Sequence, residues 1–288
     1  MPSDMPPVRY RGQVRIRVGP RKAIASEQEE RILYEKRIAR AHSFDIWPIP
    51  EASISDLSMA LFLEYRTIVI SPEIIAENHR STEEQLASLR FFNIKKNCPT
   101  NAGVLVFGSN PRYYLPGAYL QYLKFPGTVM TDTPIDQMEI SGTLPSIAEA
   151  MKDKFRANNT TKMKRKNDFR DDLLNDYPEW AIREFLHNAL IHRDYQSNAP
   201  VRFYWFEDRI EIQSPGGLYG RVTLKTITRT NDYRNPVIAE ALKVLGYVNR
   251  FGFGIQNAQH YLQKNGNLPA EIVADQNTVL VTIRRRNT

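Results

Sequence analysis

The sequence has very little cysteine and no long apolar run. Cys98 is the only cysteine among 288 residues, which excludes an internal disulfide and a cysteine-built metal cluster and predicts a packing role for this side chain. No apolar run approaches the ~20 residues of a membrane-spanning helix, and the N-terminal residues lack the pattern of a secretory signal peptide. We therefore expect a cytoplasmic protein without a membrane partner.

Motifs of several enzyme classes are also missing. The sequence contains no G-x-x-x-x-G-K-[ST] loop, so a helicase that uses such a loop to hold phosphates is not supported. Its five histidines show no H-E-x-x-H spacing, which removes the common zinc-hydrolase pattern.

The composition is that of a basic globular protein. Hydrophobic residues make up 42% of the chain and the net charge is +7. This length is enough to bury a substantial core and to divide into two or three units. The positive charge favours anionic partners, nucleic acid first, although basic charge also serves solubility.

A helix is predicted after Pro178, where apolar residues recur at helical spacing. The apolar positions are Ile182, Phe185, Leu186, Ala189 and Leu190. Glu184 and Asn188 lie one turn apart on nearly the opposite side, so both side chains can reach one small target. A carboxylate beside a carboxamide suits a general base next to an oxygen ligand for Mg²⁺. The alternative is an ordinary solvated helix face.

Two glycine turns follow this helix. A hairpin with alternating apolar residues, 201–212, ends at Pro215-Gly216-Gly217, where a backbone without bulky side chains lets a ligand approach. Gly252-Phe253-Gly254 then opens a second helix, and amides at a helix N-terminus favour phosphate. Each turn alone is equally consistent with a plain strand exit or a tight turn.

Taken in order, these motifs resemble a known family. Residues 173–288 are similar to the divergent ATP-binding domains of the gyrase, histidine kinase and MutL (GHKL) superfamily, in the branch of RecG-related regulators. The resemblance is carried by motifs that read Glu184-x-x-x-Asn188-Ala189-x-x-His192-Arg193-Asp194-Tyr195, Asp208 to Ile212, Pro215 to Leu218, Arg234-Asn235-Pro236, and Gly252 to Ile255.

The resemblance implies an α+β fold whose C-terminal part is a two-layer α/β sandwich of the GHKL (Bergerat) type. It implies that Glu184 orients or deprotonates the attacking water and that Asn188 ligates Mg²⁺. The implied nucleotide-binding set is Asn188, Ser214, Gly216, Gly217, Arg250, Gly252 and Gly254. Ser214 departs from the family, whose active ATPases place an adenine-recognising aspartate there, and an uncharged serine weakens that selection.

The N-terminal residues 1–45 predict one strand, Val8 to Val18, followed by a helix that opens at Ser26. This segment resembles the tail of a Schlafen-type AlbA domain, a nucleic-acid-binding module. A single strand cannot stabilise itself. The open alternatives are a truncated reading frame, a homo-oligomer or partner that completes the domain, and a strand that joins a downstream sheet.

Residues 46–172 predict a helical connector and a small α+β middle domain, in which Thr100 to Gly108 resembles a T-N-A-G segment of the same family. A winged-helix reader is disfavoured because the second helix, 83–91, is acidic at its start. The densest basic cluster follows, at Lys162, Lys164, Arg165, Lys166 and Arg170. It predicts either a nucleic-acid contact or a solvated linker helix.

The sequence therefore predicts an ATP- and Mg²⁺-binding regulator, transcriptional or otherwise associated with DNA or another nucleic acid, with at most slow ATP hydrolysis. The alternative is a non-enzymatic DNA-binding transcriptional regulator with a degenerate nucleotide pocket, and a protein-interaction scaffold is a third. Kinase activity is not supported, because no phosphoacceptor domain accompanies the pocket.

Overall fold

A six-stranded mixed sheet forms the centre of the molecule. The computed structural model describes residues 9–10, 12–18, 21–31, 33, 43–167, 170–230, 232–248 and 253–286. Within them the sheet has the strand order β12-β13-β11-β10-β6-β7. Its strands are β6 (Tyr119–Lys124), β7 (Asp136–Ser141), β10 (Val201–Trp205), β11 (Arg209–Pro215), β12 (Glu271–Ala274) and β13 (Thr278–Arg284).

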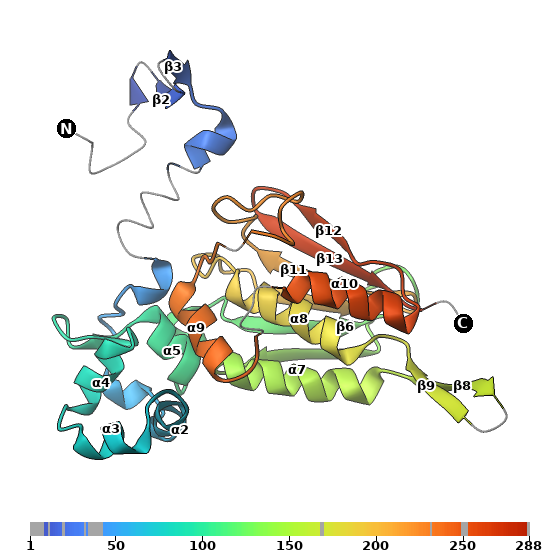
Figure 1. Ribbon diagram of the computed structural model, residues 1–288, viewed down its shortest axis with the longest axis horizontal. Helices are drawn as coiled ribbons and strands as arrows, with labels where there is room; N and C mark the ends of the chain where they lie inside the picture. The colour runs from blue at the N-terminus through green and yellow to red at the C-terminus, as the bar shows by residue number, and fades with distance from the viewer. Residues whose placement is uncertain are drawn as a thin grey trace.

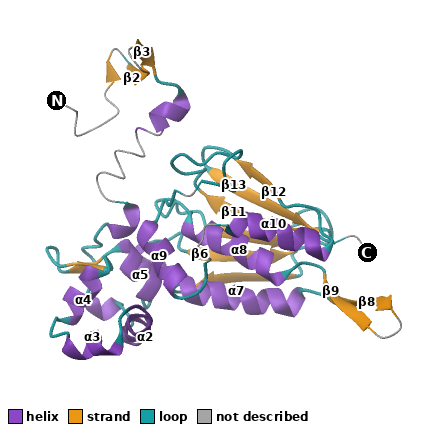
Figure 2. Ribbon diagram, in the orientation of Figure 1, coloured by secondary structure: helices purple, strands orange, loops and turns teal. Residues whose placement is uncertain are grey.

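Three helices cover one face of this sheet (Figures 1 and 2). They are α7 (Leu144–Asn158), α8 (Glu179–Ile191) and α10 (Gly254–Asn265). α8 contacts both α7 and α10 and packs on β11. Burial alternates along β10, with Val201, Phe203 and Trp205 facing the helices, because successive strand residues point to opposite faces. The layered α/β arrangement and the hairpin predicted at 201–212 are both present.

The sheet crosses the domain boundary predicted at residue 173. β6 pairs in parallel with β10, with Leu120 opposite Val201, and β7 pairs with β6. One continuous hydrophobic core runs from Ile49 to Ile283. The alternating pattern of β6 indicates a strand but not its partner, because parallel pairing joins segments far apart in the chain. Residues 46–172 therefore supply two strands to the same sheet as residues 173–288.

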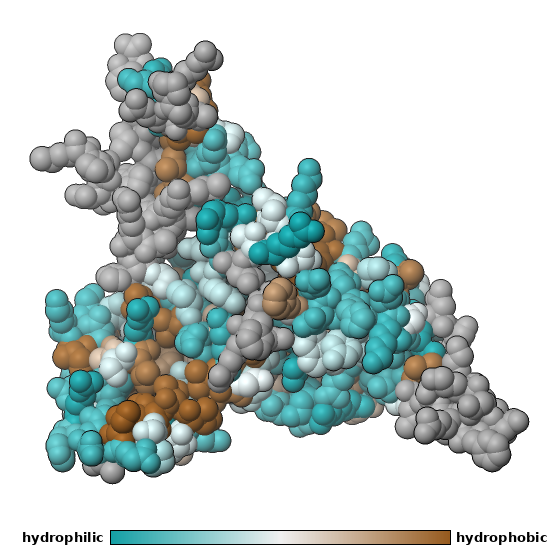
Figure 3. Space-filling model, viewed as in Figure 1, coloured by the Kyte–Doolittle hydropathy of each residue, from teal (hydrophilic) through white to brown (hydrophobic). Residues whose placement is uncertain are grey.

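A group of short helices and one small two-stranded sheet pack at one end of the central sheet. The helices are η1 (Phe44–Ile46), η2 (Ile54–Asp56), α2 (Met59–Val69), α3 (Pro72–Glu77), α4 (Thr82–Ser88), α5 (Asn101–Phe107), α6 (Pro111–Tyr114) and α9 (Pro236–Val244). The small sheet pairs β4 (Phe92–Asn93) with β5 (Cys98–Pro99). Every residue of α5 is buried, and Cys98 is buried as expected. Figure 3 shows apolar side chains gathered over this end; the exposed ones on α2 and α3 are Leu61, Leu63, Ile68, Val69 and Ile74.

Asp45 joins the start of this helical group to α9. Its fully buried carboxylate accepts hydrogen bonds from the backbone amides of Val237 (2.7 Å) and Ile238 (3.2 Å). Asn235 occupies the N-cap position of α9, but its side chain makes no capping bond. The Asn235 amide donates instead to the carbonyls of Ile191 and Arg193. A residue distant in sequence thus caps α9, and the amides at the start of this helix favour its negative charge.

Two predicted elements are corrected by the structure. The prediction of one strand from Val8 to Val18 is wrong, because β1 (Arg9–Tyr10), β2 (Gln13–Val18) and β3 (Arg21–Ile24) form an antiparallel three-stranded sheet. Gly12, at φ 79°, lies in the turn between the first two strands, where glycine is favoured.

The basic cluster lies on a hairpin, not on a linker helix. β8 (Thr161–Asn167) carries Lys162, Lys164, Arg165 and Lys166, and β9 (Arg170–Asn175) begins at Arg170. This hairpin projects from the body at the end opposite α9 (Figure 1). None of the helices in the described part of the chain is long and apolar enough to cross a membrane.

Candidate functional site

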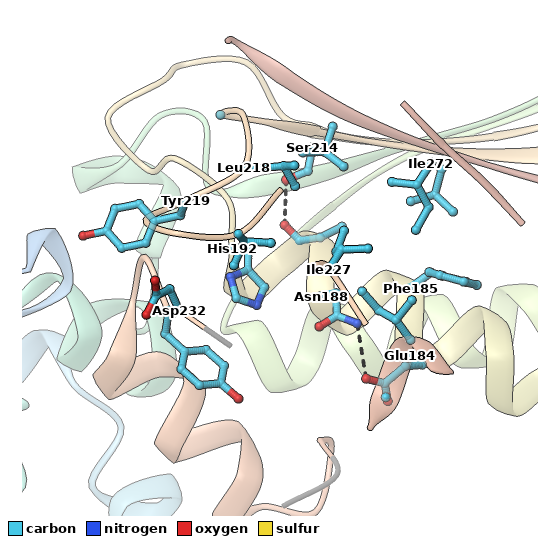
Figure 4. A pocket seen from close by; sticks show the side chains of 18 of the residues that line it. Glu184, Phe185, Asn188, His192, Ser214, Leu218, Tyr219, Ile227, Asp232 and Ile272 are labelled. Carbon is cyan, nitrogen blue, oxygen red and sulfur yellow. Dashed lines mark hydrogen bonds between the residues drawn. The ribbon is translucent and has the colours of Figure 1, made fainter. Parts of the chain in front are cut away.

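A cavity of about 120 Å³ lies between α8, the end of β11, the loop 216–233 and the start of α10. Figure 4 shows side chains from all of these segments converging on it. The polar residues that line it are Glu184, Asn188, His192, Ser214, Tyr219, Thr230, Asp232 and Tyr233. The structure therefore brings the predicted Glu184 and Asn188 together with the predicted strand-end glycines.

Glu184 is buried and only half satisfied. Its side chain is 3% exposed; Oε1 accepts a hydrogen bond from Asn188 Nδ2 at 3.2 Å, while Oε2 is buried without a partner among the described residues. Burial raises the pKa of the Glu184 carboxyl, against the smaller opposing effects of the Asn188 hydrogen bond and the Arg183 charge. A carboxylate with a raised pKa and a free oxygen suits proton transfer with a bound water.

Gly254 brings the start of α10 against this carboxylate. A Cβ atom at Gly254 would overlap the Glu184 side chain, so glycine is the residue that permits this approach. α10 begins here and runs for 12 residues, which places its first amides and its positive dipole end beside the cavity. Arg250 and Gly252, also predicted for this turn, lie outside the described residues.

The strand-end turn is held by backbone contacts. Gly216 has φ 92°, and a Cβ atom there would lie 2.8 Å from Asp194 Cβ; a Cβ atom at Gly217 would overlap the Asp275 carbonyl. Ser214 is 6% exposed, and its hydroxyl donates to the Ala189 carbonyl at 2.7 Å. The Ser214 hydroxyl proton is therefore already used inside the protein, between β11 and α8.

The site also contains residues that spacing alone does not single out. The His192 ring stacks on Tyr233 at 5.3 Å between centroids, and burial lowers the pKa of His192 to about 4, helped by the nearby Arg234 charge. Arg234 donates to the carbonyls of His192 and Gly217, which ties α8 to the glycine turn. The motif positions of His192 and Arg234 could have marked them, but nothing in their local pattern predicts contact with each other.

The basic residues predicted for nucleic acid are not part of this cavity. Lys162, Lys164, Arg165, Lys166 and Arg170 belong to the β8–β9 hairpin, and none is among the cavity's lining residues. Any contact they make with a polyanion is separate from the cavity.

Part of the chain is similar to a known protein family. Residues 198–283 match the family described as "Putative ATP-dependent DNA helicase recG C-terminal", which confirms the RecG-related resemblance for this part. The matched range contains Ser214, Gly216, Gly217 and Gly254 but begins after Glu184 and Asn188. No curated protein matches the sequence.

The fold is similar to that of a solved protein, the DIP2311 protein from Corynebacterium diphtheriae. The likeness has a TM-score of 0.64 at 20% sequence identity and covers 96% of this chain. The chain spans about half of that protein, 54% of its length. At this identity the likeness concerns the fold alone.

Proposed function

We propose, on the premise of the RecG-related ATPase-like match at residues 198–283, that this chain binds ATP with Mg²⁺ in the cavity beside α8. The observation that carries the proposal is the unpartnered Oε2 of buried Glu184, held beside Asn188 and against Gly254. A buried carboxylate oxygen without a partner is costly unless a ligand or water satisfies it. In a GHKL-type site, bound ATP and the attacking water would both lie beside this carboxylate.

Asn188 suits a role in holding the metal. Its Nδ2 donates to Glu184, and its Oδ1 has no hydrogen-bond partner among the described residues. An amide oxygen is a hard ligand of the kind Mg²⁺ accepts alongside water and phosphate oxygens. Bound Mg²⁺ would supply positive charge to the phosphates.

Glu184 then orients a water and accepts its proton. Its raised pKa brings proton affinity closer to that of a general base at neutral pH. The start of α10 at Gly254 favours phosphate charge next to that water. The carboxylate has one oxygen held by Asn188, which leaves the other for the water.

We further propose that the nucleotide state regulates binding to nucleic acid or another partner, with slow turnover. The β8–β9 hairpin, which carries the basic cluster, directly precedes α8 in the chain. A shift of α8 on nucleotide binding would therefore be passed directly to the hairpin. Cations along a hairpin suit phosphate contacts.

One observation favours a second function, a DNA-binding transcriptional regulator that does not use ATP. The Ser214 hydroxyl donates to Ala189 and carries no charge, so it does not replace a carboxylate that accepts from an adenine amino group. Such a protein would bind DNA with a steep salt dependence and would be indifferent to ATP.

Thermal unfolding with and without Mg-ATP separates the two functions. Ligand at ~100 times its Kd adds about 2.7 kcal/mol to the unfolding free energy, which raises Tm by several degrees for a protein of this size. A rise that needs Mg²⁺ and is absent in Asn188→Ala supports the nucleotide site. No shift at millimolar ATP would leave the ATP-independent regulator.

A further inference from the structure

A second cavity lies behind α8, on the side away from the candidate ATP site. It has a volume of about 190 Å³ and is bounded by α7, α8 and the turn 245–247 that follows α9. α7 and α8 lie side by side on the same face of the sheet (Figure 1). We call it the rear groove, and neither the motifs nor the family match assigns it a role.

Apolar side chains line much of the rear groove, and four charged ones border it. The apolar residues are Ala148, Met151, Phe155, Ile182, Leu186 and Leu245. Two of the charged residues, Glu149 and Glu179, are already paired: Lys152 contacts Glu149, and Arg156, outside the groove, contacts Glu179 at 2.6 Å. The groove therefore offers an apolar lining with most of its charge neutralised in place.

Arg183 is the exception among these charges. It forms no ion pair with any described residue, and its Nε is buried without a hydrogen-bond partner. Its guanidinium lies over the face of Trp180, 5.7 Å from the ring centroid. A guanidinium presents donors in a fixed fork that matches a carboxylate, so an anion in the rear groove would satisfy a buried donor.

Tyr247 closes one end of the rear groove. Burial, together with the nearby Glu149 charge, raises the pKa of Tyr247 to about 12, so the hydroxyl keeps its proton. The neutral His187 ring, whose pKa burial lowers to about 4, donates from Nδ1 to the Tyr247 carbonyl at 2.5 Å. This hydrogen bond holds the turn 245–247 against α8, so the groove has a defined end.

We propose that the rear groove binds a small organic monocarboxylate, its carboxylate paired with Arg183 and its apolar body against Met151 and Leu186. One unpaired guanidinium matches one negative charge. The apolar lining favours a ligand with a hydrocarbon or aromatic body over a bare ion.

Occupancy of the rear groove would act on the candidate ATP site through α8. Arg183 and His187 directly precede Glu184 and Asn188 in the sequence. The site would thus be regulatory, with two distinct ligands on opposite sides of one helix.

Equilibrium dialysis with benzoate tests the proposal on the full chain without nucleotide. We expect one benzoate per chain and at least about tenfold weaker binding in Arg183→Gln, because the variant cannot form the charge-assisted pair. Arg183→Lys, which keeps the charge but not the fork, should fall between the two. Arg80→Gln makes the same change at an exposed arginine and should bind like the wild type.

A second measurement uses the wild-type protein and therefore does not require that any variant folds. Bound benzoate should give nuclear Overhauser contacts from its ring protons to the methyl groups of Met151 and Leu186. Absence of binding, equal binding by Arg183→Gln, or phosphate binding as tight as benzoate would each overturn the proposal. Because no nucleotide is present, these results stand whether or not the protein binds ATP.

Discussion

Glu184 keeps a carboxyl group buried where its ionised form is penalised. Its folded pKa is raised, so the folded state binds the proton more tightly than the unfolded state does. The sign follows from linkage: stability is greatest below the unfolded value of ~4.3 and falls as pH rises from there through the folded pKa. Near neutral pH, the buried Glu184 carboxyl therefore lowers the free energy of unfolding.

Glu184→Gln should therefore raise Tm at pH 7 and have little effect at pH 4. The same change should abolish ATP hydrolysis while leaving Mg-ATP binding within a few-fold, because the amide cannot accept a proton. Melting curves at the two pH values and a phosphate-release assay measure both effects. Glu179→Gln, at a half-exposed position on the same helix, is the matched control. Unchanged hydrolysis in Glu184→Gln would remove the proposed base.

Ser214 can be tested for its structural role. Its hydroxyl bonds the Ala189 carbonyl in a buried place, so Ser214→Ala should lower stability by about 1–2 kcal/mol. Chemical denaturation gives the value. If ATP binds, affinity should change less in Ser214→Ala than in Asn188→Ala, because the hydroxyl faces the protein and Asn188 faces the ligand. A larger loss of ATP affinity in Ser214→Ala than in Asn188→Ala would assign the contact with adenine to Ser214.

At the scale of elements, the first turns of α9 and α10 each depend on a contact with a residue distant in sequence. Asp45 caps α9 from far along the chain. Asp45→Ala should destabilise the protein by about 1–3 kcal/mol, because it removes the cap and leaves two buried amides unsatisfied. Denaturant unfolding measures this, and Asp153→Ala, at an exposed position on α7, should be neutral. A neutral Asp45→Ala would mean that α9 does not need this cap.

Gly254 sets how closely α10 approaches α8. Gly254→Ala places a methyl group where the Glu184 carboxylate lies, so one of the two must move. We expect at least tenfold weaker Mg-ATP binding, measured by calorimetry. Gly127→Ala, where a Cβ atom meets nothing within 4 Å, is the control. Equal affinity in both variants would show that the start of α10 does not contact the nucleotide.

Local pattern was sufficient for elements that carry their own signals. The period-2 alternation of β10 and β11, the capping box at Ser81 and Glu84, and the apolar stripe of α8 are each determined by residues a few positions apart. Asp45 as the cap of α9, and β6 beside β10, depend on residues brought together only by the fold. The same reason explains why Glu184 and Asn188 could be paired from spacing, while the His192–Tyr233 stack could not.

At the scale of the whole molecule, the proposed nucleic-acid contact concerns the basic hairpin, which projects from the body (Figure 1). Replacing Lys164 and Lys166 by Gln should weaken DNA binding and lower the salt slope by ~0.9 for each phosphate that the hairpin no longer neutralises. Fluorescence anisotropy at several salt concentrations measures this. Replacing Lys95 and Lys96, which are exposed at the helical end, is the control. An unchanged slope in the hairpin variant would place DNA binding elsewhere.

The shared sheet decides which fragments can be studied. A chain cut to residues 173–288 would lack β6 and β7 and leave β10 with an open edge. We expect this fragment to aggregate, since an unpaired apolar edge pairs with other chains. A fragment of residues 43–288 keeps the sheet and should stay monodisperse in size-exclusion chromatography. A monodisperse 173–288 fragment would show that β10 does not need β6.

The strand order also sets how the protein can form during translation. β6 and β7 leave the ribosome first and make a hairpin, β10 then docks beside β6, and β11 docks beside β10. Each of these strands meets an edge already made, so this part of the sheet can grow outward from β7, whereas β12 has no partner until β13 is made. β13 is the last strand synthesised yet sits between β11 and β12. Until it emerges, the edge of β11 stays open beside the candidate ATP site, which makes the end of synthesis the period of greatest exposure to chaperones and to misassembly.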